Sequence, residues 1–505
     1  MNKSAGVLLG IVVAIGAISA GGAWYTGTQL EGVLNASVAD TNKELESALV
    51  GSNGKASLEL VSLERHVFSS TAHFRLKGEG QLFGDAPIEL LFVDHIEHGP
   101  LPASRLFSLK WLPVMATLHY ELEKTPLTEK WFAAAKDVSP LKGLVNIGYD
   151  KATNGNVELV PLELALNDKV SLKFSGLNLE VSATAQAQKL KASGYMNSLK
   201  LTAVSENQAP IQIELNGLTL ASNLSKSPYG YYTGENTVEL TDSKTTFGAK
   251  QSVVGIKNFE MKSQTEESGT NASGRADYKM GEMSLNGKAV GSAQLAMSAK
   301  NLDIPSSMSL MQIYQTKLQP YEKAVTKAAA AHLPAPELNL TPAEQAQIKA
   351  GLEKLLAAGP QLALENLSFT TPNGESRANL VLDLTKPTSM DLSPDQLVRQ
   401  VIALLDINLQ VSKPMLVDVL SAQAQAQAQA GGQTDAKAIA DQAKATSDMF
   451  SAMAVGTQLA KLDGNNVVSK LHYANNQVEF NGQKMTVEQF VGFVMGKLGG
   501  AGAIQ

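Results

Sequence analysis

Alternating apolar and polar residues dominate the chain after about residue 56. The stretches 170–174 and 211–215 each place an apolar residue at every second position, with polar residues between them. A two-residue period is typical of antiparallel strands that bury one face. The pattern therefore predicts a β-rich α+β protein built on an elongated, repetitive antiparallel β-sheet, with helical insertions covering one face of the sheet.

A six-residue pattern recurs within this region: apolar, any residue, Gly or Asn, apolar, polar, apolar. It occurs in FSGLNL, LNGLTL, IKNFEM and AKNLDI, whose third residues are Gly176, Gly217, Asn258 and Asn301. Their spacings are 41, 41 and 43 residues, and LENLSF at 364–369 is a fifth copy. Because Gly and Asn tolerate a left-handed backbone, we expect a kink or bulge at each third position. The even spacing predicts a repeated unit of several strands.

Helical spacing of apolar residues precedes the strands. Leu30, Val33, Leu34 and Val38 follow this spacing and predict a stalk helix over 29–49. The Gly- and Asn-containing tetrapeptide GSNG follows and is expected to end it.

Two sequences of the capping-box type open later helices. TPAE, beginning at Thr341, predicts a helix to about residue 358, and the preceding stretch 307–331 also follows a helical pattern. SPDQ, beginning at Ser393, predicts another helix whose apolar positions extend to Leu404. The Ala/Gln tract 421–433 is expected to be an exposed helix end that runs into a Gly-Gly break.

The C-terminal region predicts a hairpin followed by a helix. The hairpin turns at Asn475-Asn476, and Thr486 is expected to cap the last helix. The predicted segments are an anchor (1–25), a stalk helix (26–55), a repetitive β-sheet region (56–305), a helical insertion (306–360), β strands (361–390), a helical segment with the Ala/Gln tract (391–460) and a C-terminal hairpin and helix (461–505).

The first 25 residues contain a segment suited to a membrane. Ser4–Trp24 is 21 residues without a charge, and at ~1.5 Å per residue it spans a ~30 Å hydrocarbon core. Lys3 precedes it, which favours a cytoplasmic N-terminus. The alternative is a cleaved signal peptide, because small residues stand at suitable cleavage positions. The predicted anchor residues are Leu8, Leu9, Ile11, Val12, Val13, Ile15 and Ile18, with Trp24 and Tyr25 at the interface.

Composition and charge exclude several classes of protein. The 505 residues contain no cysteine, which rules out disulfides, thiolate metal sites and cysteine nucleophiles. The formal net charge of −6 argues against a nucleic-acid partner, since such a partner requires a basic surface. Aromatic residues are only 6%, so the core is expected to consist mainly of aliphatic side chains.

The segment DHIEHGPLP at 94–102 is a candidate metal or acid–base site. An apolar run precedes it and prolines follow, which favours a strand. Neighbours on a strand point to opposite faces, so His95 and His98 cannot share a metal, whereas His95 and Glu97 form at most a hydrogen-bonded pair. Zinc needs three or four converging ligands. We interpret the segment as the polar end of a strand and predict no catalytic residue, metal site or cofactor.

Two glycine-containing stretches superficially match nucleotide-binding loops. GEGQLFG at 78–84 has the wrong spacing for a dinucleotide loop. GEMSLNGKA, beginning at Gly281, has an alanine where a phosphate loop places Ser or Thr. Both stretches are interpreted as turns.

Several stretches combine into a family resemblance. GGAWYTG follows the apolar segment, VFSS follows Arg65, HGPLP ends the early strand, and YANNQVEFNGQKMTVEQFVGF closes the chain. In this order and spacing they resemble the YdgA-like family of Gram-negative bacterial envelope proteins over the whole chain. The resemblance implies a single-pass inner-membrane protein with a cytoplasmic N-terminus and a periplasmic body, and it is compatible with a homo-oligomer. It implies no reaction, because the function of the family is unknown.

Two functions remain open from the sequence. The first is a non-enzymatic envelope protein that acts as an interaction module, with the sheet face fully covered by the helices at 307–358 and 394–460. The second is a lipid-binding or lipid-transfer protein that resembles AsmA-like envelope proteins, with the inner-membrane bilayer and phospholipid as partners. An enzyme is disfavoured, because no spacing selects a catalytic pair of carboxylates. An apolar groove in the second case would be lined by Leu172, Phe174, Leu177, Leu179, Ile211, Ile213, Leu218 and Leu220.

Overall fold

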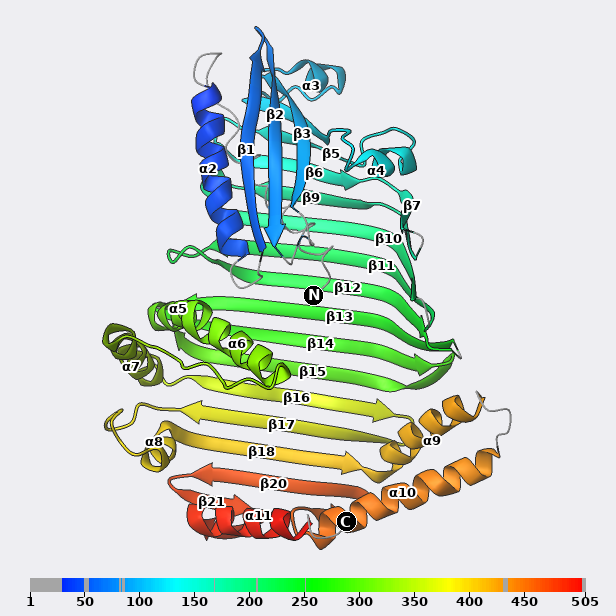
Figure 1. Cartoon of the computed structure of the whole chain (residues 1–505), viewed down its shortest axis with the longest axis vertical. Helices are drawn as coiled ribbons and strands as arrows, with labels where there is room; N and C mark the ends of the chain where they lie inside the picture. The colour runs from blue at the N-terminus through cyan, green and yellow to red at the C-terminus, as the bar shows by residue number, and fades with distance from the viewer. Residues whose placement is uncertain are drawn as a thin grey trace. The chain divides into compact units, whose positions relative to one another are not determined.

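The computed structural model describes residues 30–49, 54–80, 83, 87–167, 169–205, 208–249, 251–429 and 435–501. The chain divides into two compact units, residues 1–240 and 241–505, and the boundary falls within one strand. Each unit is mostly antiparallel sheet with some helices, which confirms the predicted β-rich α+β class (Figure 1). The predicted anchor, Leu8 to Tyr25, lies outside the described residues. Within the described ranges, no helix has both the length and the apolarity needed to cross a membrane.

Unit 1 begins with a helix and continues mainly as strands. Its elements are α2 (Leu30–Ala48), β1 (Gly54–Arg65), β2 (Ser69–Gly80), β3 (Ile88–His98), α3 (Ala103–Phe107), β4 (Ala116–Leu122), α4 (Glu129–Ala134), β5 (Leu141–Ile147), β6 (Thr153–Leu159), β7 (Leu162–Asn167), β8 (Val170–Phe174), β9 (Leu177–Ala183), a short 3₁₀ turn (Ala185–Ala187), β10 (Lys189–Ser205), β11 (Gln208–Lys226) and β12 (Tyr232–Phe247), which contains the unit boundary.

The strands of unit 1 pair mostly with their neighbours in the sequence. From β1 to β6 each strand is antiparallel to the next. β6 then pairs with β9, and β9 pairs with β10. The β7–β8 hairpin joins β10 through β8, and β11 lies along the other edge of β10. The half-buried alternation of the sequence thus corresponds to a meander of antiparallel strands.

Helix α2 closes the core of unit 1 and matches the helix predicted over 29–49. Its buried positions include Leu34, Thr41 and Leu45, which recur at helical spacing and lie on one face. Leu34 and Leu45 pack with apolar side chains from β1 to β6. Asn42 fixes the helix to β1, because its side chain both donates to and accepts from the backbone of Leu58 at 2.9 and 2.7 Å.

Unit 2 continues the strand pattern and carries the longer helices. Its elements after β12 are β13 (Ser252–Ser268), β14 (Asn271–Leu285), β15 (Lys288–Asp303), α5 (Ile304–Ile313), a π-helical turn (Tyr314–Leu318), α6 (Gln319–Ala330), α7 (Pro342–Ala357), β16 (Gln361–Thr371), β17 (Gly374–Leu384), α8 (Pro394–Val401), β18 (Ile402–Ser412), α9 (Lys413–Gln429), α10 (Ala436–Gly456), β19 (Lys461–Asp463), β20 (Asn466–Ala474), β21 (Gln477–Phe480), β22 (Gln483–Thr486) and α11 (Val487–Ala501).

The strands of unit 2 also form a meander. Each strand from β13 to β18 pairs antiparallel with the next, β18 pairs with β20, and β20 continues to β21 and β22. The short β19 pairs with the first residues of β20. The predicted hairpin turn is confirmed, since Asn475 and Asn476 connect β20 to β21 with φ of 51° and 60°.

The helix starts were predicted with mixed success. Thr341 and Glu344 form the full capping box at the start of α7, as expected. Thr486 and Gln489 exchange the equivalent hydrogen bonds at the start of α11. The capping box at Ser393 was wrong, because the Ser393 side chain makes no capping hydrogen bond.

The predicted helical segment 391–460 is interrupted by a strand. Residues 402–412 form β18 and not a continuation of α8, because they pair along their length with β17 and β20. Leu404, expected on the helix, lies in this strand. The exposed helix end expected at 421–433 is also corrected: α9 contacts strands β14 to β18, so most of its described residues beyond 420 are half-buried.

Candidate functional site

The segment DHIEHGPLP forms the end of strand β3 and the start of the following loop, as predicted (Figure 1). His98 Nε2 lies 3.0 Å from the Ser70 hydroxyl, and burial lowers the pKa of His98. His95 Nδ1 lies 3.4 Å from the Thr71 hydroxyl. Glu97 accepts hydrogen bonds from the backbone and hydroxyl of Ser104. The predicted His95–Glu97 pair was therefore wrong, because each side chain is taken by a partner on another element.

These side chains do not converge on one point. In the described part of the chain, no group of three or more His, Cys, Asp or Glu residues is arranged to hold a metal ion. We interpret the role of the segment as structural. His98 joins the end of β3 to Ser70 of β2, and Glu97 joins β3 to Ser104 of α3.

Asp94 in the same segment is an unusual member of the core. Asp94 is 1% exposed, and neither of its carboxyl oxygens has a hydrogen-bond partner. It lies on β3 between the buried residues Phe92 and Ile96, opposite Ala72 of β2 and Tyr120 of β4. Burial raises the pKa of Asp94 to about 7. Burial, followed by the charge of Asp94, also raises the pKa of Tyr120. One signal was present in the sequence, because the two-residue alternation of β3 places Asp94 in phase with Leu90, Phe92 and Ile96.

The repeated Gly/Asn positions are left-handed, as predicted. Gly176, Gly217, Asn258 and Asn301 have φ of 95°, 66°, 52° and 57°. Asn366, in the fifth copy, does not belong to this left-handed group, but the register of β16 shifts there against both of its neighbours. A bulge thus replaces the left-handed residue in the last copy.

The kink at Asn258 keeps apolar residues paired on both sides of the break. Before Asn258 in β13, Ile256 pairs with Met283 of β14, and after it Phe259 pairs with Met280. A Cβ on Gly281 of β14 would lie 2.9 Å from Cβ of Asn258, so the two strands approach closely at the kink. The three-residue apolar spacing across Asn258 therefore preserves continuous apolar pairing along the β13–β14 hairpin.

Strand register gathers apolar side chains into three rows across unit 2, and we call them together the apolar face. Directly paired residues of antiparallel strands share one face of the sheet. The middle row comprises Met297, Leu364, Leu380, Ile407, Leu471 and Phe480. The flanking rows comprise Leu295, Leu367, Ala378 and Leu409 on one side and Ala299, Leu362, Leu382, Leu405, Tyr473 and Val478 on the other. At ~4.8 Å between strands, the middle row is ~24 Å long.

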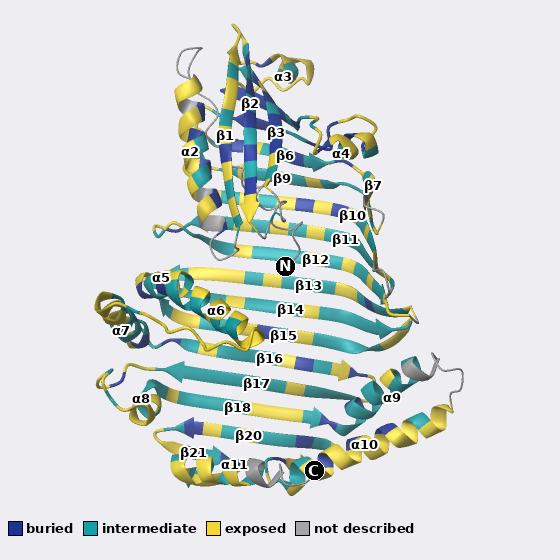
Figure 2. Ribbon diagram, in the orientation of Figure 1, coloured by how far each residue is buried: buried dark blue, intermediate teal, exposed yellow. Residues whose placement is uncertain are grey.

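Helices cover this face only in part. The ring of Phe480 packs against Phe490 and Phe493 of α11, with centroids 5.3 and 6.0 Å apart, so α11 closes one end of the middle row. α9 contacts β14 to β18, whereas α5 and α7 contact β15. Within the described residues, Leu367 and Leu409 remain 47% and 43% exposed. Full coverage by the predicted helices was thus wrong, because part of the sheet between these helices remains uncovered (Figure 2).

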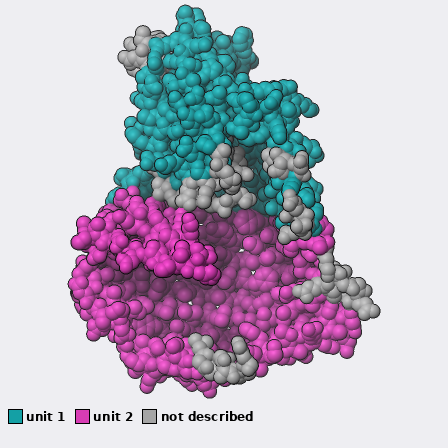
Figure 3. All heavy atoms as spheres, in the orientation of Figure 1, with its two compact units in different colours: residues 1–240 teal, residues 241–505 magenta. Residues whose placement is uncertain are grey.

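The surface of unit 2 is hollowed beside α5 and α6, as its space-filling view shows (Figure 3). The strands seen between the helices are half-buried to exposed over much of their length (Figure 2). An apolar surface that is concave and partly uncovered is a common setting for binding an apolar molecule.

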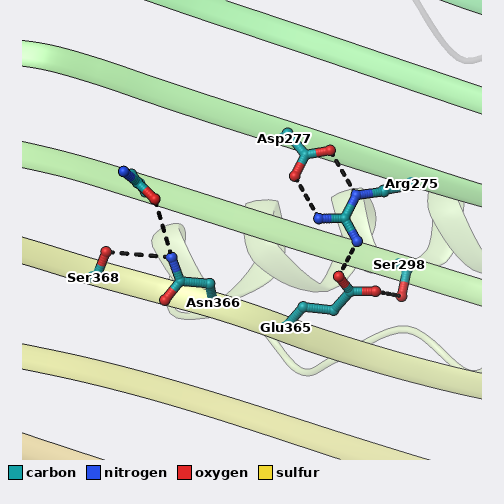
Figure 4. Close-up of polar contacts among 7 residues, drawn as sticks. Arg275, Asp277, Ser298, Glu365, Asn366 and Ser368 are labelled. Carbon is teal, nitrogen blue, oxygen red and sulfur yellow. Dashed lines mark hydrogen bonds and ion pairs between the residues drawn. The ribbon is translucent and has the colours of Figure 1, made fainter.

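The opposite face of this sheet is polar. Arg275 donates two hydrogen bonds of 2.7 Å to Asp277 and also contacts Glu365, which accepts from Ser298 at 2.7 Å (Figure 4). The Ser298 hydrogen bond, together with Arg275, lowers the pKa of Glu365. In Figure 4 these side chains lie in front of the strands and helices lie behind them.

A recess of about 300 Å³ lies beside this polar network. Acidic and basic side chains contribute equally to its wall, with Glu260 paired to Lys262. Since the charges compensate one another locally, the recess selects neither an anion nor a cation, and we interpret the polar face as the solvated side of the sheet.

The eight groove residues expected from the sequence all lie in unit 1, on β8, β9 and β11. Through β10, the register aligns Leu172 with Ile213, and Leu179 with Leu220. Seven of the eight are half-buried and Ile211 is exposed. The apolar rows of unit 2 were not anticipated as a site. The alternation in NLVLDL at 379–384 indicated that this strand has one apolar face. Only the strand register shows that the apolar residues of neighbouring strands line up into continuous rows.

Known proteins resemble the chain over nearly its whole length. A family model described as a bacterial protein of unknown function (DUF945) matches residues 1–488. Protein YdgA of Escherichia coli (strain K12) is 28% identical, covering 97% of this chain and 96% of that protein. The uncharacterized protein YihF of the same organism is 23% identical over 95% of this chain and 97% of its own. No solved structure matches. The expected family resemblance is confirmed.

Proposed function

Since the chain belongs to the DUF945 family of bacterial proteins of unknown function, we propose that it is a non-enzymatic, membrane-anchored envelope protein that binds lipid acyl chains on the apolar face of unit 2. The observation that carries the proposal is the continuity of the three apolar rows, together with their incomplete cover. In this proposal Ser4–Trp24 is retained as a single-pass inner-membrane anchor, with the N-terminus in the cytoplasm and the body in the periplasm.

The dimensions of the apolar face suit an acyl chain. The middle row is ~24 Å long, whereas one lipid chain fills about half of a ~30 Å hydrocarbon core. Its residues are Leu, Ile, Met and Phe, and none of the three rows carries a charged side chain. The side chains of the middle row provide no hydrogen bonds to a polar ligand, which favours aliphatic chains.

The exposed part of the face gives such binding a driving force. Covering an apolar side chain fully is worth ~1.5–3 kcal/mol, so Leu367 and Leu409, each nearly half exposed, would contribute about half of this value apiece. The competing interaction module predicted a face that is completely covered by helices, and the described residues leave it partly open.

The test is photo-crosslinking of the full chain in living bacteria fed an alkyne-labelled fatty acid. A benzophenone amino acid replaces Leu367 or Leu409 on the apolar face. The matched controls place it at Arg377 or Gln410, which pair with each other on the polar face and are also exposed. After illumination, we expect labelled lipid on the protein at the two leucine positions only.

Two outcomes would reject the proposal. Equal labelling on both faces would mean non-specific contact with lipid. Absence of lipid at Leu367 and Leu409, with protein crosslinks there, would replace lipid binding with the interaction-module function. Intact-mass measurement of the same purified protein tests the anchor, since cleavage before Leu30 removes a mass that is easily resolved.

A further inference from the structure

Six large apolar side chains protrude from two neighbouring loops at one end of unit 1. Val67 and Phe68 occupy the turn between β1 and β2, and the others lie on or after α3 (Figure 2). Phe107 is 89% exposed, Phe68 is 82% exposed and Trp111 is 64% exposed. We call this group the loop patch; it comprises Val67, Phe68, Phe107, Leu109, Trp111 and Leu112.

Backbone hydrogen bonds order the two loops that carry the loop patch. His98 N donates to the carbonyl of Phe68 at 2.9 Å, which joins the two loops. Gly99 N donates to Met115 O at 2.7 Å, and Val114 N donates to Pro100 O at 2.9 Å. The last two bonds close the base of the segment 98–115, which we call the longer loop, so its apolar side chains are exposed on a fixed support.

Other hydrogen bonds order the outer part of the longer loop. Arg105 donates to the carbonyl of Leu112 at 3.0 Å and to the Asn146 side chain at 3.0 Å. Lys110 N donates to Arg105 O at 2.9 Å. Apolar side chains that hydrogen-bonded loops hold in an exposed position indicate a binding surface, because their exposure to water is otherwise unfavourable.

The position of α2 identifies the kind of partner. Glu31, in the first turn of α2, forms an ion pair of 2.6 Å with Arg65 at the end of β1, two residues before Val67. The start of α2 and the loop patch therefore lie at the same end of unit 1 (Figure 1). Residues 25–29 separate Trp24 from Leu30, and a chain of this length reaches at most ~20 Å.

The chemistry of the longer loop agrees with this position. Residues 98–115 contain no acid, whereas Arg105 and Lys110 are basic. Trp favours the boundary between headgroups and acyl chains, and basic side chains are attracted to anionic lipids. We propose that the loop patch inserts into the outer leaflet of the membrane that holds the anchor, and thereby fixes unit 1 against the bilayer. This inference rests on the retained anchor of the proposed function, but not on lipid binding by unit 2.

Insertion predicts that Trp111 meets lipid, and the three tryptophans of the chain allow a matched test. The full chain is reconstituted in nanodiscs of phosphatidylcholine and phosphatidylglycerol, with either ordinary or brominated acyl chains. Trp24→Phe with Trp131→Phe leaves only Trp111, whereas Trp24→Phe with Trp111→Phe leaves only Trp131. Trp131 packs against the unit 1 core and serves as the internal control.

We expect brominated lipid to reduce Trp111 emission roughly twofold or more and to leave Trp131 emission unchanged, because loops that insert ~5–10 Å reach the depth of the bromines. Phe107→Ser with Leu112→Ser, both at exposed positions, should abolish this quenching. Equal, weak quenching of both tryptophans would overturn the inference. Protection of Trp111 from aqueous iodide without quenching by brominated lipid would also overturn it, and would assign the loop patch to a protein partner or a second copy.

Discussion

Replacing Asp94 with asparagine should make unit 1 more stable at neutral pH and change its response to pH. The carboxyl group is buried in the core without a hydrogen-bond partner. Burial raises its pKa to about 7 in the folded protein, whereas an unfolded aspartate has a pKa of ~3.9. Between these two values the folded state keeps a proton that the unfolded state has lost. The free energy of unfolding therefore falls as pH rises through this window.

The size of the effect follows from the difference between the two pKa values. About three pKa units correspond to a loss of roughly 4 kcal/mol between pH 4 and pH 8. An asparagine side chain cannot ionise, so Asp94→Asn avoids this loss while retaining the shape of the side chain. The stability difference between variant and parent should be small near pH 4 and should grow by ~1.4 kcal/mol per pH unit up to about pH 7. Other titrating groups are common to both proteins and cancel in this difference.

The assay is urea unfolding of the full chain in mild detergent, followed by the fluorescence of Trp131. Trp131 packs against the unit 1 core, so in a background without Trp24 and Trp111 it reports the unfolding of that unit. Each protein is measured from pH 4 to pH 8. A stability difference that stays constant over this range would refute the reasoning, because Asp94 would then titrate alike in the folded and unfolded states.

Three further substitutions test the loop base, the end of the apolar face and the kinks. Gly99→Ala places a Cβ 2.0 Å from Val114 O and should lower the free energy of unfolding of unit 1 by roughly 1–3 kcal/mol in urea. Gly492→Ala, at an exposed position of α11, meets no atom within 4 Å and should raise the free energy of unfolding by up to ~1 kcal/mol in the same assay. Phe480→Ala removes the ring beneath α11 and should lower the free energy of unfolding by ~3–5 kcal/mol. The variant should also make α11 more sensitive to protease, and unchanged sensitivity would contradict this role. In thermal unfolding, Asn258→Val should destabilise the protein by ~1–2 kcal/mol, whereas Asn258→Gly should be nearly neutral. Equal effects of the two substitutions would argue against the need for a left-handed backbone at residue 258.

The features predicted correctly from the sequence depend on local physics. The capping box at Thr341 and the left-handed backbone at Gly217 or Asn258 are set by residues within one turn or one strand. The α2 helix was also predictable, because its apolar stripe has the helical period. In each of these cases the relevant interaction spans only a few residues.

Features that depend on distant partners could not be predicted. The apolar positions of the helix predicted from Ser393 extended to Leu404, but pairing with β17 and β20 makes residues 402–412 a strand. The alternation of β3 marks Asp94 as inward-facing, but its lack of a hydrogen-bond partner depends on Ala72 and Tyr120, which register with it across neighbouring strands. The apolar face of unit 2 likewise depends on how the strands align, since each strand alone shows only ordinary alternation.

The left-handed Gly and Asn residues also suggest how such a sheet could gain strands. Gly217, Asn258 and Asn301 lie on β11, β13 and β15, so one repeat corresponds to one hairpin of two strands. Duplication of one such hairpin would widen a sheet by ~10 Å and carry its own kink with it. The newly added strands would present apolar residues in phase with their neighbours from the outset. A chain built in this way could therefore widen its sheet in discrete steps of one hairpin, without changes to the strands already present.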